Sequence, residues 1–265
     1  MRLEGKTAIV VGAGQTPGET IGNGRATAIL YAREGARVLL VDRDLASALE
    51  TLAMIEQEAG QAIVFEADVT SEDACRAMVE ACLAAYGRID VLHNNVGIGT
   101  GDDEVSRLEE EAWDRILNVN LKSAFLTCKH VLPTMRRQES GAIINISSLA
   151  AVAATTDLTA YKISKAGLNA LTHTLAMTNA RYGIRVNAIM PGLIETPMAI
   201  ETIASRRGIT KEALVKERHA RVPLRGRMGT AWDVANAAVF LASEEARFIT
   251  GVVLPVDGGQ SARIG

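Results

Sequence analysis

The sequence is poor in cysteine: of its 265 residues, only Cys75, Cys82 and Cys128 carry a thiol. Cys75 and Cys82 lie too far apart along a predicted helix to form a disulfide, and Cys128 stands alone. The spacing matches no metal-binding cysteine pattern, so no metal site is expected. These absences predict a protein of a reducing compartment, and we expect it in the cytoplasm.

Long apolar runs and a charge excess are missing as well. No segment approaches the roughly 20 apolar residues that cross a bilayer, and the first residues lead into a predicted strand without the pattern of a signal peptide. The net charge is −3, and no basic stripe stands out beyond Arg206-Arg207 and the run to Arg227. We therefore expect neither a membrane nor a nucleic acid as a partner.

What the sequence does contain is a regular alternation of strand and helix patterns. Strands are expected at residues 7–11, 37–41, 63–65, 91–93, 142–146, 185–189 and 252–256. Helices are expected at residues 22–34, 45–59, 71–86, 111–120, 122–137 and 161–182, with Asp44 and Ser71 as N-caps. This alternation predicts an α/β fold over residues 1–265: a single-domain, Rossmann-type, doubly wound sheet of about seven parallel strands with helices on both faces.

The stretch from Ile143 to Lys165 ends in a tyrosine–lysine pair. If Tyr161 lies near the start of a helix, Lys165 follows one turn later on the same face. An ammonium about 4 Å away, at an effective dielectric constant of about 20, contributes roughly 4 kcal/mol, enough to bring the tyrosine pKa from about 10 to about 7. The pair is then a candidate general acid and base. The alternative is a solvent-exposed helix face.

A serine lies at the end of the buried strand that precedes this pair. The apolar run at residues 142–146 ends in Ser147-Ser148, where a parallel strand presents its side chains to a ligand crevice. The small residues that follow would bring the chain back so that Ser148 faces Tyr161. Its hydroxyl would then hydrogen-bond a substrate oxygen while Tyr161 exchanges a proton; the alternative is a serine that only forms a turn.

Glycines between the first strand and the first helix indicate a dinucleotide site. Gly12 and Gly14 follow the strand, and Gly22-Asn23-Gly24 opens the helix, whose N-terminal N–H groups favour a pyrophosphate. Asp42, after the second strand, would hydrogen-bond the adenosine ribose and repel a 2′-phosphate, which favours NAD over NADP. Asp42 as a simple turn residue, and Arg43 as an acceptor site for that phosphate, are the alternatives.

Two further strand ends carry polar or glycine residues, at Asp68-Val69 and at His93-Asn94-Asn95-Val96-Gly97. Ligand-type residues therefore follow several strands at one edge of the predicted sheet. His93 itself is interpreted as a structural strand residue.

These motifs, in this order and over essentially the whole chain, resemble those of the short-chain dehydrogenase/reductase family. The matching segments are the glycine loop, Asn94–Gly97, Asn118–Asn120, Ser148 with Tyr161 and Lys165, residues 191–196, residues 221–225 and residues 250–259. The sequence departs from the pattern by extra residues from Gly14 to about Thr20, by Val11 in place of a threonine and by Val96 in place of an alanine. The role of the lengthened glycine loop stays open.

The resemblance implies a role for each residue of the catalytic set. Tyr161 would be the acid/base, and Ser148 would position the carbonyl or carbinol oxygen. Lys165 would bind the nicotinamide ribose and lower the Tyr161 pKa. Asn120 would anchor a water through which protons leave, although a buried asparagine that bonds helix backbone would look the same.

The resemblance also implies the cofactor contacts. Asp68 and Val69 would frame the adenine, and Ile194 and Thr196 would orient the nicotinamide. The full set of expected contacts is Gly12, Gly22, Asn23, Gly24, Asp42, Arg43, Asp68, Val69, Asn95, Val96, Gly97, Tyr161, Lys165, Pro191, Gly192, Ile194 and Thr196.

The resulting hypothesis is an NAD-dependent oxidoreductase that interconverts a secondary alcohol and a ketone by hydride transfer. The alternatives are an NADPH-dependent carbonyl reductase, including one for 3-oxoacyl thioesters, and a catalytically silent nucleotide-binding protein. Family resemblance also implies a homotetramer, with the helices at residues 122–137 and 161–182 across one interface and the C-terminal segment across another.

The expected substrate is small and largely apolar or ring-bearing. Its walls would come from residues 96–98, 149–158 and 192–193, which offer little to hold a charged group, and from residues 197–222, a probable substrate-binding loop or lid. The cations of this last segment, Arg206, Arg207, Lys211 and Arg218, would either recognise an anionic substrate or belong to a solvated helix.

Overall fold

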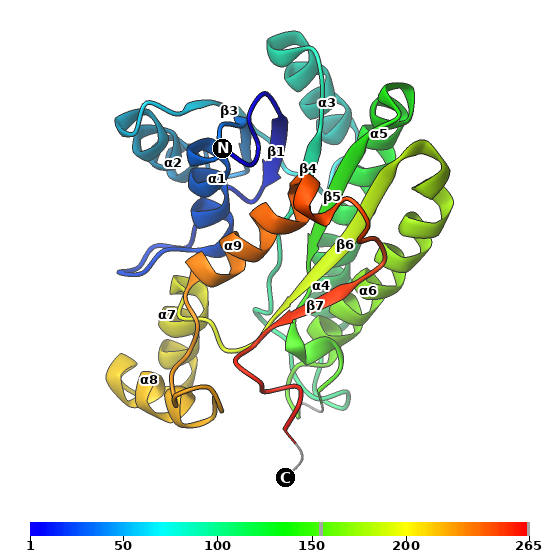
Figure 1. The fold of residues 1–265 in the computed structure, drawn as a ribbon. Helices are drawn as coiled ribbons and strands as arrows, with labels where there is room; N and C mark the ends of the chain where they lie inside the picture. Colours follow the sequence, from blue (N-terminus) through cyan, green and yellow to red (C-terminus); the bar gives the residue numbers. More distant parts are fainter. Residues whose placement is uncertain (154–155, 264–265) are drawn as a thin grey trace.

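The strands form one parallel sheet in a computed structural model that describes residues 1–153 and 156–263. Within those residues the sheet has seven strands in the order β3-β2-β1-β4-β5-β6-β7 (Figure 1). Their bounds are β1 Thr7–Val11, β2 Arg37–Asp42, β3 Gln61–Glu66, β4 Val91–Asn94, β5 Gly141–Ile146, β6 Ile184–Pro191 and β7 Val253–Val256. The order reverses between β1 and β4, which is where open α/β sheets bind ligands. The predicted fold class is confirmed.

Helices cover both faces of the sheet (Figure 1). Their bounds are α1 Asn23–Arg33, α2 Leu45–Gln57, α3 Glu72–Tyr86, α4 Glu110–Leu117, α5 Ser123–Gln138, α6 Thr159–Asn179, α7 Pro197–Arg207, α8 Lys211–Ala220 and α9 Ala231–Ala242. Side chains alternate along each strand, so Ala8 and Val10 pack with α1 and α9 on one face, while Ile9 and Val11 pack with α3 and α5 on the other.

The structure differs from the sequence prediction at three places. Helix α9, which was not predicted, provides the crossover that makes β7 parallel to β6, and a capping box of Thr230 and Asp233 begins it. A π-helical turn at Asn118–Lys122 joins α4 to α5. The segment expected as a loop or lid at residues 197–222 folds into α7 and α8; its function as a lid stays a prediction.

The cysteines are free, as the sequence predicted, and all three are buried. Burial raises the pKa of Cys75 to about 11 and that of Cys128 to about 12, so these thiols are unreactive at neutral pH. Asp44 and Ser71 cap α2 and α3 as expected. In the described part of the chain, no helix is long and apolar enough to cross a membrane, and no group of acidic, histidine and cysteine side chains could hold a metal ion.

A buried polar ladder crosses the core beneath the carboxyl ends of β4 and β5. Thr127 on α5 donates to Asn94 Oδ1 over 2.8 Å, and Asn94 Nδ2 donates to Asn145 Oδ1 over 3.0 Å. Asn145 Nδ2 then donates to Thr172 Oγ1 on α6 over 2.9 Å. Because every partner is buried, the ladder ties two strands and two helices together at a fixed register.

Replacing the central residue of this ladder should destabilise the fold. Asn145→Ala removes the acceptor of Asn94 Nδ2 and the donor to Thr172 Oγ1 in a fully buried site, so we expect the free energy of unfolding to fall by on the order of 2 kcal/mol. Asn236→Ala is the matched control, because this exposed side chain bonds only the Trp232 carbonyl of its own helix. Denaturant unfolding at one protein concentration measures both. Equal losses would show that the ladder contributes nothing specific.

Candidate active site

The predicted catalytic residues come together at the carboxyl edge of the sheet. Ser148 follows β5, and Tyr161 and Lys165 lie in the first turns of α6. The Ser148 and Tyr161 side chains are hydrogen-bonded to each other. The ammonium of Lys165 lies 5.8 Å from the centre of the Tyr161 ring and donates to the Ile146 carbonyl over 2.8 Å. The expectation that Ser148 faces Tyr161 therefore agrees with the geometry.

The ionisation of the pair differs from the sequence expectation. Burial raises the pKa of Tyr161 above its ordinary value, and the hydrogen bond from Ser148 offsets only part of this. Burial also lowers the pKa of Lys165 to about 8. The predicted net lowering of the Tyr161 pKa was wrong for this arrangement, because burial dominates the shift and the Lys165 ammonium donates to the Ile146 carbonyl instead.

Asn120 lies in the π-helical turn and is almost fully buried. Its Oδ1 accepts from the Ile98 N–H over 2.7 Å, and its Nδ2 donates to the Ile98 carbonyl over 2.9 Å and to Ser164 Oγ over 3.0 Å. Ser164 in turn donates to the Tyr161 carbonyl over 2.7 Å. The backbone that Asn120 bonds therefore belongs to the loop after β4, rather than to a helix as the alternative reading had it.

Asp102 holds the start of the catalytic helix, and sequence reasoning missed it. Its buried carboxylate accepts from the Ala160 N–H over 3.0 Å and from the Tyr161 N–H over 2.8 Å. Leu158, at the N-cap position of α6, offers no side-chain cap. An uncapped helix start was the available signal, but nothing local identified the partner 58 positions earlier.

The glycines at the end of β1 lie against one another. Asn95 Nδ2 donates to the Gly12 carbonyl over 3.1 Å, and Gly12 has φ +82°, which favours glycine. A Cβ on Gly24 would overlap the Gly12 carbonyl oxygen, so only glycine allows this approach of α1 to β1. Gly12, Gly22 and Gly24 thus leave the N-terminus of α1 open to a ligand; we call them the glycine cradle.

The expected adenosine end is built by Asp42 and its neighbours. Asp42 Oδ2 accepts from the Gly14 N–H over 2.9 Å and Oδ1 from the Asp44 N–H over 3.0 Å, so lone pairs remain on both oxygens for ribose hydroxyls. Hydrogen bonds from Thr70 and the nearby Arg43 guanidinium hold the pKa of Asp68 below its usual range. Arg43 thus lies near Asp68, and Val69, the next residue after Asp68, is buried.

The opposite wall of the site is the segment after β6. Gly192, next to Pro191, donates its N–H to the Val256 carbonyl over 3.0 Å. Ile194 is buried and bridges to Gly229. Thr196 Oγ1 accepts from the Ala199 N–H over 3.3 Å and so caps α7. The expected nicotinamide contacts therefore form one continuous wall that leads directly into α7.

The residues present fit a dinucleotide. Glycine at position 24 lets the start of α1 approach the end of β1, and Asn23 Oδ1, at the start of α1, is buried without a hydrogen-bond partner. Gly97 lies beside the Lys165 ammonium, and Val96 lies against Gly12. Both residues therefore line the carboxyl edge of the sheet. Asp42 supplies a carboxylate at one end of this line, and the wall at residues 191–196 closes the other.

The expected substrate walls are mostly apolar where the structure describes them; Ala154 and Thr155 lie outside the described residues. Three of the four cations named above pair with carboxylates. Arg206 bonds Asp157 over 3.1 Å, Arg207 bonds Glu217 over 2.9 Å and Lys211 bonds Glu201 over 2.8 Å. His93 is fully buried beside Tyr31, and burial lowers its pKa to about 3, so it is structural as expected.

Comparison with known proteins adds the family. The sequence profile of the family described as enoyl-(acyl carrier protein) reductase matches residues 19–261. The chain is 40% identical over 259 residues to the 3-oxoacyl-[acyl-carrier-protein] reductase FabG of Thermotoga maritima, covering 98% of this chain and 99% of that protein. It is 36% identical over 258 residues to the cis-4-hydroxycyclohexanecarboxylate dehydrogenase of Sinomonas cyclohexanicum, covering 97% of each.

A solved structure from Burkholderia xenovorans, described as a short-chain dehydrogenase/reductase, has a TM-score of 0.94 and 43% identity to this chain. The match covers 100% of this chain and 99% of that one. Likeness in sequence and in fold thus extends over the whole length. The chain belongs to the short-chain dehydrogenase/reductase family, whose members use NAD or NADP, and it is an oxidoreductase acting on CH–OH or carbonyl groups.

Proposed function

We propose that the chain is an NAD-dependent oxidoreductase that interconverts a small, largely apolar or ring-bearing secondary alcohol and its ketone, with Tyr161 as the acid/base. One observation carries this proposal: Ser148 and Tyr161 are hydrogen-bonded beside the buried Lys165, at the same sheet edge as the glycine cradle. A silent nucleotide-binding protein would have no need for this constellation.

The nicotinamide cofactor supplies the redox chemistry when it is bound. Ser148 donates a hydrogen bond to the substrate oxygen and holds it next to the Tyr161 hydroxyl. Because burial raises the pKa of Tyr161, this hydroxyl keeps its proton at neutral pH and is ready to give it to a carbonyl oxygen. In the opposite direction, Tyr161 must first lose that proton, so alcohol oxidation gains from higher pH.

The choice of NAD rests on Asp42, whose carboxylate lies where a 2′-phosphate would have to approach. The likeness to FabG favours a second candidate, an NADPH-dependent reductase of 3-oxoacyl thioesters. The likeness to the hydroxycyclohexanecarboxylate dehydrogenase favours a ring-bearing alcohol.

The homotetramer stays part of the proposal. Phe125 on α5 is 48% exposed and Met177 on α6 is 67% exposed in the single chain. Large apolar side chains on these two helices are what a contact between copies would cover.

Removal of the Tyr161 hydroxyl should abolish turnover without loss of the cofactor. For Tyr161→Phe we expect kcat to fall by about a thousandfold, because no other acid reaches the substrate oxygen. The binding of NADH, followed by its fluorescence, should change less than twofold. Tyr182→Phe, on the far end of the same helical segment, is the control and should keep full activity. Retained activity in Tyr161→Phe would refute the mechanism.

Asp42 should set the cofactor preference. Asp42→Asn removes the charge that repels a 2′-phosphate, so we expect the ratio of kcat/KM with NADP to that with NAD to rise by about tenfold or more. Asp44→Asn, an acid two residues away that caps α2, should leave the ratio unchanged. A wild-type enzyme that already prefers NADP would instead support the second candidate.

Asp102 should act on the reaction through Tyr161, as a positioning residue. Its carboxylate places negative charge at the start of α6, which disfavours a phenolate on Tyr161. In wild type, kcat/KM for alcohol oxidation should rise with pH because only the deprotonated tyrosine accepts a proton. Asp102→Asn should move this rise to lower pH by about half a unit.

The control for this shift is Asp103→Asn, whose carboxylate pairs with Arg107 at the surface. Both variants are compared in pH profiles from about pH 6 to 10. If Asp102 has only a structural role, Asp102→Asn should lower stability and kcat but leave unchanged the pH at which kcat/KM rises.

A further inference from the structure

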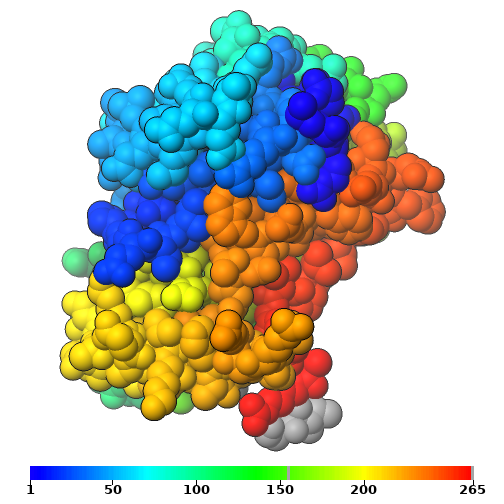
Figure 2. All heavy atoms as spheres, turned by 60° about the vertical axis from the view of Figure 1, so that its left-hand side comes forward, coloured from blue at the N-terminus to red at the C-terminus, as the bar shows by residue number. Residues whose placement is uncertain are grey.

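The extra residues of the glycine loop form a strap that reaches from the adenosine end of the site to α7. We use the name strap for residues 15–21, between Gly14 and the start of α1. In Figure 1 this segment extends away from α1 toward α7, and in Figure 2 its blue atoms lie against the yellow atoms of the α7–α8 region. The sequence pattern gave no role for these residues, but their contacts do.

The base of the strap is fixed by one glutamine. The Gln15 N–H donates to Ser47 Oγ over 2.9 Å, next to the Gly14 N–H that Asp42 binds. The Gln15 side chain then closes the loop, because its Oε1 accepts from the Gly22 N–H over 2.8 Å and its Nε2 donates to the Thr20 carbonyl over 3.3 Å. The strap is therefore a closed loop anchored beside Asp42.

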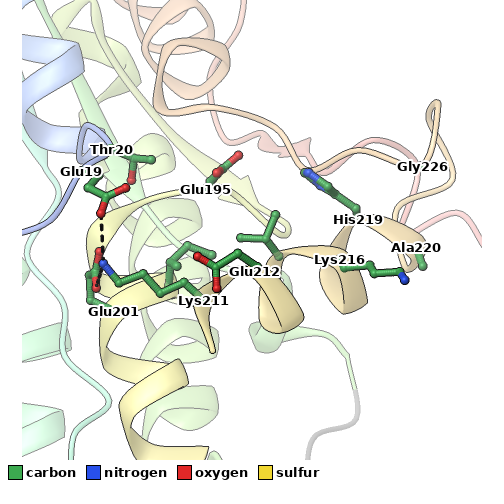
Figure 3. A pocket seen from close by; sticks show the side chains of 12 residues that line it. Glu19, Thr20, Glu195, Glu201, Lys211, Glu212, Lys216, His219, Ala220 and Gly226 are labelled. Carbon is green, nitrogen blue, oxygen red and sulfur yellow. Dashed lines mark hydrogen bonds and ion pairs between the residues drawn. The ribbon is translucent and has the colours of Figure 1, made fainter. Parts of the chain in front are cut away.

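The tip of the strap rests on the wall opposite. A Cβ on Gly18 would lie 2.8 Å from Pro197 Cβ and 3.0 Å from Glu201 Cγ, so the backbone there touches the first turns of α7. Beside it, Lys211 of α8 reaches Glu201 over 2.8 Å and Glu19 of the strap over 3.4 Å (Figure 3). Both contacts flank a groove of about 570 Å³.

The helices that receive the strap have a small core of their own. Ile200, Leu214 and Met228 belong to a buried cluster separate from the two clusters that line the sheet. On its other flank, α7 is joined to the substrate wall by the pair of Arg206 and Asp157. Helices α7 and α8, here called the lid, therefore meet the rest of the protein partly through exposed ion pairs, which break easily in water.

We propose that the strap and the lid together close over the bound dinucleotide, and that Lys211 is the latch whose opening governs cofactor exchange. A ligand that touches both Asp42 and Thr196 lies between the two attachments of the strap. It can then leave only when Gly18 and Glu19 separate from α7 and α8. This inference rests on the proposed function for the identity of the ligand, but its test requires binding alone.

A reversible covalent lock tests the closure. A Cβ on Gly18 would lie 3.0 Å from Glu201 Cγ, so in Gly18→Cys/Glu201→Cys the two Cβ atoms lie within about 4.5 Å, which a disulfide can span, and the buried native cysteines do not compete. Stopped-flow fluorescence of NADH gives association and dissociation rates for the oxidised and the dithiothreitol-reduced protein. We expect oxidation to lower both rates by at least tenfold and reduction to restore them. Association and dissociation rates of NADH that are equal in the oxidised and the reduced protein would overturn the proposal.

A second variant tests the latch without new cysteines. Lys211→Met removes both ion pairs, so NADH should dissociate several-fold faster. The rate in wild type should rise with salt, and this rise should disappear in the variant. Lys216→Met changes an exposed lysine of the same helix and groove and should match wild type. Equal dissociation rates in these two variants would overturn the latch. A wild type that binds neither NADH nor NADPH would overturn the proposed function, and this inference with it.

Discussion

The buried carboxylate of Asp102 is the interaction on which the candidate site depends most. It receives the first N–H groups of α6, which the preceding residue cannot cap, and so fixes the helix that carries Tyr161 and Lys165. The loop that contains it also passes the Tyr161 ring at Gly99 and bonds Asn120 at Ile98. One loop after β4 thus holds the start of α6 through Asp102, lies against the Lys165 ammonium at Gly97 and bonds the Gly12 carbonyl through Asn95.

Burial at this edge has opposite effects on the two titrating groups. It raises the pKa of Tyr161 and lowers the pKa of Lys165 to about 8, since both neutral forms are favoured when water is removed. A protonated tyrosine beside a lysine that has a lowered pKa is suited to donating a proton. The same tyrosine becomes a base only when the site gains positive charge or the pH rises. If Tyr161 is the acid/base, as we propose, its protonated form serves carbonyl reduction at neutral pH, and the concentrations of substrate and cofactor decide the net direction.

The sequence allowed the sheet, most helices and the catalytic set to be predicted, because strand periodicity, the glycines and the Tyr161–Lys165 spacing are local signals. It did not reveal Asp102, which acts across 58 positions, nor α9, whose alanine-rich sequence has only Asp233 and Asn236 as polar residues. The pKa of Tyr161 was misjudged for a related reason. Pair spacing gives the distance between two groups along a helix, whereas the loss of water around them depends on every segment that packs over the site.

The contacts of the strap likewise join residues that lie far apart in the sequence. An insertion between β1 and α1 costs little entropy to close, because it leaves and re-enters the fold at Gly14 and Gly22, which Gln15 holds together. Its tip then meets α7 through a glycine and α8 through an exposed lysine, contacts that are specific in position but weak in energy. Strong contacts there would trap a cofactor that has to leave after each turnover. Under the proposed closure, weak contacts permit this exchange.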